Sequence, residues 1–149
     1  MGRGRGGYSE VQPRYKDSGG KFVKDSGAIF VAERYIELGY EAVFRREKPP
    51  DKSYDLTIKT SDDKFFVKNI EVKQVISSNP SKIATELKRG TTQLPKDGTG
   101  TVAIYLPNFS NDAEGIAHVT KGYNEAVRKN FVKCHVEVWF KDKTKLVLN

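Results

Sequence analysis

The sequence predicts one mixed α/β domain, in which a central mixed β-sheet is flanked by helices. Two observations favour this class. Segments with helical periodicity alternate along the chain with segments of strand character, an order typical of a sheet covered by helices. The length of 149 residues is that of one ordinary domain, and a composition with 37% hydrophobic residues provides a core.

The first 20 residues differ in composition from the rest and are expected to form a flexible Gly/Arg-rich arm or linker, followed by a single domain over residues 21–149. This stretch contains six glycines and almost no aliphatic side chain, so it cannot bury enough apolar surface to order itself. An RGG-like nucleic-acid tether is the alternative, but two Arg-Gly pairs are few for that role. The N-terminus lacks the apolar core of a signal peptide, so no Sec-type export signal is expected.

The first predicted helix begins near Asp25 or Ser26, either of which can cap the apolar stretch that follows. Apolar residues then recur at helical spacing, and Gly39 is a natural end for the helix. A short strand is expected over residues 41–44. The charged segment after it contains two adjacent prolines and is expected to be a loop.

The middle of the chain predicts a β-hairpin, a helix and a buried strand. Residues 54–59 and 65–76 are strand-like and are separated by polar turn residues, which favours a hairpin. A helix is expected over residues 81–94, because Pro80 suits a first helical turn. The continuous apolar run of residues 101–106 predicts a central strand.

The remaining residues predict one helix and two strands. The helix covers about residues 113–129, with Asn111 or Asp112 as its cap and an apolar stripe at positions 116, 119, 123 and 127. A strand, a turn and a second strand are expected over residues 134–149.

The charge balance favours a polyanionic partner. The formal net charge of +7 suits nucleic acid or an anionic membrane surface and does not choose between them. The single cysteine, Cys134, excludes an intramolecular disulfide framework and a multi-cysteine zinc site. No apolar run approaches the roughly 18 residues that a bilayer-spanning helix needs.

The predicted hairpin carries the most informative chemistry. Asp55 lies early in its first strand, and Glu71 and Lys73 lie two apart in its second strand, so these two side chains share a face. Two carboxylates and a lysine suit metal-assisted phosphodiester hydrolysis, because hard cations such as Mg²⁺ prefer oxygen ligands. Asp55 and Glu71 would hold the metal, and Lys73 would orient water or offset charge on the phosphorus. A surface hairpin with a Glu–Lys ion pair is the alternative.

This arrangement resembles the PD-(D/E)XK nuclease superfamily, in which a helix precedes a hairpin carrying an Asp and then Glu-x-Lys. The matching residues are Asp55 in YDLTI, and Glu71 and Lys73 in IEVKQ. Tyr54 stands where a proline often precedes the acid. Residues 25–106 further resemble the C-terminal nuclease domains of contact-dependent growth inhibition toxins, in which a Lys/Arg-rich helix with a Gln precedes an apolar strand.

The resemblance also implies an additional acid on the first helix. Superfamily members often carry a Glu there, for which Glu33 is the natural candidate, and Glu37 or Asp25 could serve instead. The catalytic site would then comprise Asp55, Glu71, Lys73 and Glu33. The alternative for Glu33 is a solvated helix position paired with a nearby basic residue.

The helix after the hairpin would contact the nucleic acid. Phosphates are held by lysine and arginine, and related nucleases carry functional residues on this helix. The resemblance therefore implies that Lys88, Arg89 and Gln93 bind the substrate. An ordinary solvated helix face is the alternative.

The resemblance implies a metal-dependent toxin nuclease. Its metal would be Mg²⁺, with Mn²⁺ or Zn²⁺ also suitable, and its substrate would be RNA, with tRNA favoured. Such a toxin would be secreted as part of a larger protein, act in the cytoplasm of a target cell and be neutralised by an acidic immunity protein. The alternatives are a DNA endonuclease of toxin, restriction or recombination type, and a non-catalytic nucleic-acid-binding module.

Overall fold

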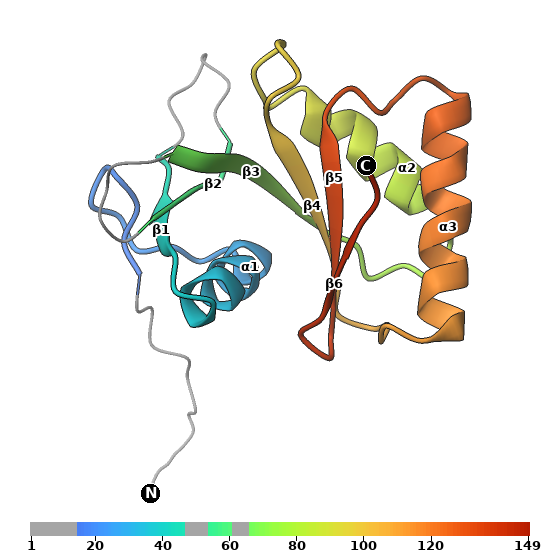
Figure 1. Ribbon diagram of the computed structural model, residues 1–149, viewed down its shortest axis with the longest axis horizontal. Helices are drawn as coiled ribbons and strands as arrows, with labels where there is room; N and C mark the ends of the chain where they lie inside the picture. The colour runs from blue at the N-terminus through green and yellow to red at the C-terminus, as the bar shows by residue number, and fades with distance from the viewer. Residues whose placement is uncertain (1–14, 47–53, 61–65) are drawn as a thin grey trace, which may run out of the picture.

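The computed structural model describes residues 15–46, 54–60 and 66–149, and within them it shows one six-stranded sheet with helices on both faces (Figure 1). This confirms the predicted α/β class with a central mixed sheet. In chain order the elements are α1 (Ser26–Glu37), β1 (Glu41–Phe44), β2 (Leu56–Lys59), β3 (Phe66–Gln74), α2 (Ser81–Thr91), β4 (Thr101–Leu106), α3 (Ala113–Arg128), β5 (His135–Phe140) and β6 (Lys145–Val147). No helix in these described ranges is long and apolar enough to cross a membrane.

The strands lie side by side in chain order, from β1 to β6. The pairs β3–β4 and β4–β5 are parallel, and the other neighbouring pairs are antiparallel. Parallel neighbours need a crossover connection, which α2 and α3 provide. The antiparallel pairing of β2 with β3 confirms the predicted hairpin, although its turn lies outside the described residues.

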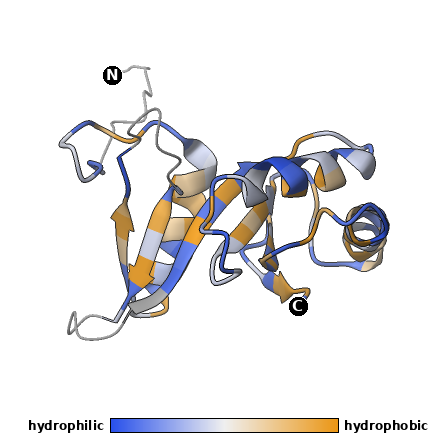
Figure 2. Cartoon of the chain, turned by 90° about the horizontal axis from the view of Figure 1, so that it is seen from above, coloured by the Kyte–Doolittle hydropathy of each residue, from blue (hydrophilic) through white to orange (hydrophobic). Residues whose placement is uncertain are grey.

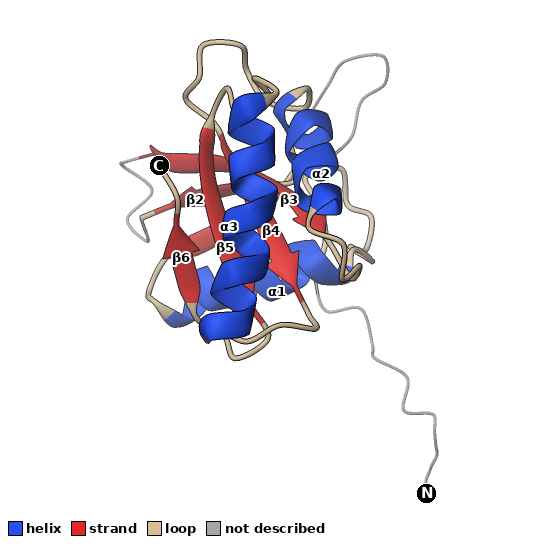
Figure 3. Cartoon of the chain, turned by 90° about the vertical axis from the view of Figure 1, so that its right-hand side faces the viewer, coloured by secondary structure: helices blue, strands red, loops and turns tan. Residues whose placement is uncertain are grey.

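Alternate strand residues contribute to two separate cores, one on each face of the sheet. Hydrophobic residues make up much of the strands (Figure 2). Along β4, Val102 and Ile104 belong to the core beneath α2 and α3, whereas Ala103 belongs to the core beneath α1. Figure 3 shows α2 and α3 in front of the sheet and α1 behind it. The same alternation directs Val72 of β3 towards α1 and its neighbours in sequence towards α2.

Helix α1 begins and ends as its sequence predicts. The Asp25 carboxylate accepts a hydrogen bond from the N–H of Ala28 at 3.0 Å and so caps the first turn. Gly39 adopts a φ of 98°, a left-handed conformation that glycine reaches without steric cost and that ends the helix. The cap fixes Asp25 at the end of α1 that faces the hairpin.

Two of the boundaries that differ from the prediction concern candidate site residues. Helix α2 ends at Thr91, so Gln93 lies in the turn that follows, where its N–H donates to the carbonyl of Gly90 at 3.0 Å. Two adjacent β-branched threonines disfavour a longer helix. Asp55 lies one residue before β2 and not within it, but its N–H donates to the carbonyl of Ile70 at 3.0 Å and continues the pairing with β3.

The predicted apolar stripe of α3 is confirmed at Val119 and Tyr123, which belong to or pack on the core, and is wrong at Ile116 and Val127. The side chains of Ile116 and Val127 are 42% and 52% exposed, and the buried face consists of Gly115, His118, Val119, Gly122 and Ala126. The reason is close packing against α2, because a Cβ added at Gly122 would lie 2.6 Å from the carbonyl oxygen of Pro80. Small residues therefore face α2, and larger apolar residues are displaced towards solvent.

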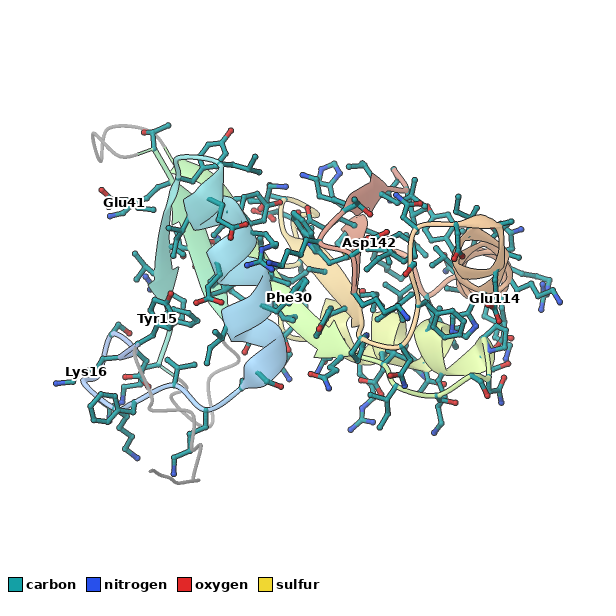
Figure 4. The ribbon with its side chains drawn as sticks, turned by 90° about the horizontal axis from the view of Figure 1, so that it is seen from below. Tyr15, Lys16, Phe30, Glu41, Glu114 and Asp142 are labelled. Carbon is teal, nitrogen blue, oxygen red and sulfur yellow. The ribbon has the colours of Figure 1, made fainter. Side chains whose placement is uncertain are left out.

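Residues 15–20, which the sequence places in the flexible arm, contact the domain. The ring of Tyr15 packs on that of Phe44 with centroids 5.2 Å apart, and its hydroxyl donates to Oε2 of Glu33 at 2.9 Å (Figure 4). Asp17 forms a β-bridge with Phe44. The aromatic ring gives this short segment apolar surface to bury, which the glycine-rich composition obscured. The rest of the predicted arm, residues 1–14, lies outside the described residues.

Candidate active site

The structure brings Asp55, Glu71 and Lys73 together where β3 extends beyond β2. The pairing of β2 with β3 reaches only as far as Ile70, so the N–H of Val72 has no partner on that strand. Oδ2 of Asp55 accepts a hydrogen bond from this N–H at 2.8 Å. Glu71 and Lys73 flank Val72 on β3, and Nζ of Lys73 lies 3.3 Å from Oε2 of Glu71. Because the pairing of β2 with β3 ends at Ile70, the N–H of Val72 can bind the Asp55 carboxylate and orient it.

Burial works against the charge of both carboxylates. Glu71 is only 5% exposed, and burial, together with the negative charge of Asp55, raises its pKa to about 8 despite the opposing effect of Lys73. Burial also raises the pKa of Asp55 to about 6, an effect that the N–H of Val72 partly offsets and that the charge of Asp25 reinforces. Two acids in one buried site resist ionising together. The Lys73 ammonium group offsets part of their charge, and a shared proton or a bound cation would offset the rest.

The donor set fits a hard divalent cation. Oε1 of Glu71 is buried and accepts no hydrogen bond from a donor group in the described part of the chain, and the Glu71 and Asp55 carboxyl groups lie close enough to share a proton. No group of three or more His, Cys, Asp or Glu side chains in that part gathers closely enough to form a metal site. Two carboxylates nevertheless suit Mg²⁺, which keeps several waters and is commonly bound through one or two carboxylates and substrate phosphates. Asp55 and Glu71 would be those two ligands.

The placement of the acids on α1 favours Asp25 over Glu33 and Glu37. Asp25 lies at the N-terminal end of the helix, close enough to Asp55 for its charge to raise the pKa of that group. Glu33 lies two turns further along the helix, where it accepts the hydrogen bond from Tyr15. Glu37 forms an ion pair with Arg34 at 3.0 Å. Glu33, the residue expected from the resemblance, is therefore directed to the N-terminal segment and not to the hairpin acids.

The expected substrate-binding residues line a groove together with Lys73. Lys73, Lys88, Arg89 and Gln93 line a cavity of about 410 Å³ between β3 and α2. Gly90 lies at this point of α2: a Cβ added there would be in ordinary contact with Cγ of Lys73, at 3.5 Å, and in tight contact with Val102, at 3.0 Å. Arg89 is also paired with Glu86 at 3.2 Å. The structure thus places all three predicted binding residues beside Lys73, with Gln93 reaching the groove from the turn after α2.

A second cavity, of about 500 Å³, opens on the other side of the site and was not foreseen from the sequence. Asp55 and Asp25 line it, and its basic residues are Lys21, Lys24, Arg45 and Arg46. These four come from the segment before α1 and from the end of β1, which are distant in sequence. The sequence shows that the segment after residue 44 is charged, but only the fold brings its basic side chains into one cavity with Asp55.

Comparisons with known proteins do not identify the chain. No protein-family model matches it, and no curated protein or solved structure matches it significantly. The function is therefore inferred from the residues of the site and their geometry.

Proposed function

We propose that the protein is a metal-dependent nuclease with Asp55, Glu71 and Lys73 as its catalytic residues. The observation that carries this proposal is the buried pair of carboxylates, in which one oxygen of Glu71 has no hydrogen-bond partner among the described residues. The pair is followed by a lysine whose Nζ lies 3.3 Å from Glu71. An ordinary surface ion pair would not bury an ionisable oxygen without a partner, because that arrangement costs stability.

Each residue has a distinct role in the proposed reaction. A divalent cation, when bound by Asp55 and Glu71, would polarise the scissile phosphate and lower the pKa of a bound water. The Val72 N–H fixes one oxygen of Asp55 and so orients the carboxylate beside Glu71. Lys73 carries its positive charge beside the carboxylates, where it offsets negative charge that develops on the phosphate oxygens. Glu71 must release its proton before it can coordinate, so metal binding lowers its pKa.

The substrate that we propose is RNA, with tRNA favoured. The net charge of +7 and the basic residues lining the cavities on both sides of the carboxylates support a polyanionic substrate. The choice of tRNA, secretion within a larger toxin, action in the target-cell cytoplasm and an acidic immunity protein follow from the toxin resemblance. An acidic partner is consistent with the basic surroundings of the site.

The test is a cleavage assay with two substrate pools. The protein is incubated with total tRNA and with plasmid DNA in Mg²⁺, in Mn²⁺ and in EDTA. We expect metal-dependent loss of tRNA, and we expect Lys73→Ala to reduce the rate by about 10²–10³-fold, as does removal of other charge-stabilising groups. Lys121→Ala, on an exposed face of α3, is the matched control and should retain the wild-type rate.

The outcomes of this assay separate the alternatives. Cleavage of plasmid alone would replace the RNA proposal with a DNA endonuclease. Undiminished cleavage in EDTA or by Lys73→Ala would contradict the proposed centre. Binding without cleavage of either pool under any metal condition would favour the non-catalytic binding module.

A further inference from the structure

We call the cavity that Lys73 lines the catalytic groove. Another groove continues from it along the end of α2. It encloses about 720 Å³ between the C-terminal end of α2, the loop before β4 and the segment joining α3 to β5. We call it the lysine groove, and the residues that matter in it are Lys88, Thr92, Lys96, Phe131 and Lys133. None of the sequence-predicted roles includes Lys96, Phe131 or Lys133.

The lysine groove is strongly basic. Among the residues that the structure describes, four lysines and no acidic side chain line it. Lys88, Lys96 and Lys133 are exposed, whereas the fourth, Lys129, is paired with Glu125 at 3.0 Å. The ammonium groups of Lys88, Lys96 and Lys133 repel one another, and a chain of phosphates would relieve this repulsion.

The lysine groove and the catalytic groove form one track. Lys88 and Thr92 line both cavities. Lys73 approaches α2 at Gly90, which lies within one helical turn of both residues. A polymer whose scissile phosphate lay at Lys73 would therefore extend directly into the lysine groove.

The lining of the lysine groove favours a single strand over a duplex. Beside the lysines it contains apolar surface from Leu94, Pro95 and Phe131. Nζ of Lys88 lies 5.1 Å from the centroid of the Phe131 ring, so a cation and an aromatic ring are adjacent. Unpaired bases stack on aromatic side chains while lysines hold the backbone, whereas a duplex keeps its base faces covered.

We propose that the lysine groove binds the single-stranded nucleotides that flank the scissile phosphate, with their phosphates on Lys88, Lys96 and Lys133 and a base against Phe131. The inference deepens the proposed nuclease function and rests on it. It assigns one end of the substrate to the α2–α3 side of the molecule.

The test measures binding without cleavage. A fluorescent single-stranded RNA of 12 nucleotides is titrated with the full chain in EDTA, between 50 and 200 mM salt, and anisotropy gives the Kd. We expect Lys96→Ala/Lys133→Ala to bind about tenfold more weakly at low salt. Each phosphate contact contributes about 0.7 to the slope of log K against log salt, so the slope should become shallower by about 1.4.

The matched control is Lys121→Ala/Lys141→Ala, which removes the same charge from exposed positions outside the lysine groove. It should keep the wild-type salt slope. Equal slopes for wild type and Lys96→Ala/Lys133→Ala, or an equal change in the control, would overturn the proposal. In that case Lys96 and Lys133 do not contact this polymer, and a partner of another class, such as an acidic protein, becomes the better occupant.

A second variant tests the base contact. Phe131→Leu keeps an apolar side chain but removes the ring, and we expect about tenfold weaker binding of the single strand with an unchanged salt slope. Binding of an RNA duplex should not change. If Phe131→Leu leaves single-strand affinity unchanged, the ring makes no base contact and that part of the proposal is wrong.

These measurements are independent of catalysis. Loss of cleavage by Lys73→Ala together with unchanged RNA binding by the lysine-groove variant would overturn the groove and leave the nuclease proposal intact. The opposite pattern, in which the groove variant loses RNA affinity but no metal condition gives cleavage, would overturn the nuclease and leave a nucleic-acid-binding surface.

Discussion

Single residues in the site are held in surroundings that oppose their charge. Glu71 is 5% exposed, and its buried Oε1 has no hydrogen-bond partner in the described ranges. Strand alternation allowed the shared face of Glu71 and Lys73 to be predicted, because that geometry depends only on spacing. The depth of burial could not be predicted, since it depends on α2 packing over the end of β3. The raised pKa values therefore emerge only from the fold.

This burial makes the stability of the protein depend on pH. The pKa of Glu71 is raised from 4.5 to about 8, so the folded state holds a proton that the unfolded state releases as the pH rises from 4.5. The stabilisation that this proton provides is complete below pH 4.5 and is lost as the pH rises towards 8. In EDTA, we expect Glu71→Gln to lose less stability than wild type between pH 5 and pH 8, by on the order of 2 kcal/mol.

Urea unfolding at the two pH values measures this difference. Glu41→Gln removes an exposed carboxylate from β1 and is the matched control, which should follow the wild-type pH dependence. If wild type and Glu71→Gln lose equal stability between pH 5 and pH 8, the pKa of Glu71 is not raised by burial in the folded protein.

At the scale of elements, the residues that begin and end a helix were easier to predict than the face of the helix that is buried. The Asp25 cap, the Gly39 end and the Asp112 cap of α3 are local features, and the structure confirms them. The buried face of α3 is not local, because it is determined by how closely α2 approaches. Gln93 was placed on a helix that ends at Thr91, yet it still lines the catalytic groove.

Gly122 provides a test of the α2–α3 contact. A Cβ there would lie 2.6 Å from the Pro80 carbonyl oxygen and 2.6 Å from Cβ of Ile83. Alanine normally stabilises a helix interior by about 1 kcal/mol relative to glycine. We expect Gly122→Ala instead to destabilise the protein by about 1–3 kcal/mol, because backbone and side chains must move apart. Thermal and urea unfolding give the value.

The control for this prediction is Asn124→Ala, an exposed position on the same helix. It should be neutral or slightly stabilising, because alanine has the higher helix propensity. A stabilising Gly122→Ala would contradict the close approach of the two helices.

At the scale of the whole molecule, the fold collects basic residues from distant segments around one end of β3. The cavity beside Asp55 takes its basic residues from the segment before α1 and the end of β1, and the lysine groove takes its own from α2 to the start of β5. The net charge of +7 predicted a polyanionic partner but not which surface of the protein that partner would contact. Proximity across the sheet depends on strand order, which composition and spacing do not determine. Asp55 lines the first of these cavities, and Lys73 lines the groove that shares Lys88 and Thr92 with the second.

The proposed function depends above all on a cation held by Asp55 and Glu71. Calorimetric titration of Mn²⁺ into the full chain at pH 7.5 measures this binding without a substrate. We expect one site in wild type, with proton release because Glu71 must ionise, and we expect the site to be lost in both Glu71→Gln and Asp55→Asn. Glu41→Gln should bind as wild type does. Undiminished Mn²⁺ binding by Glu71→Gln and Asp55→Asn, or no binding by wild type, would contradict the assignment of these two carboxylates as metal ligands.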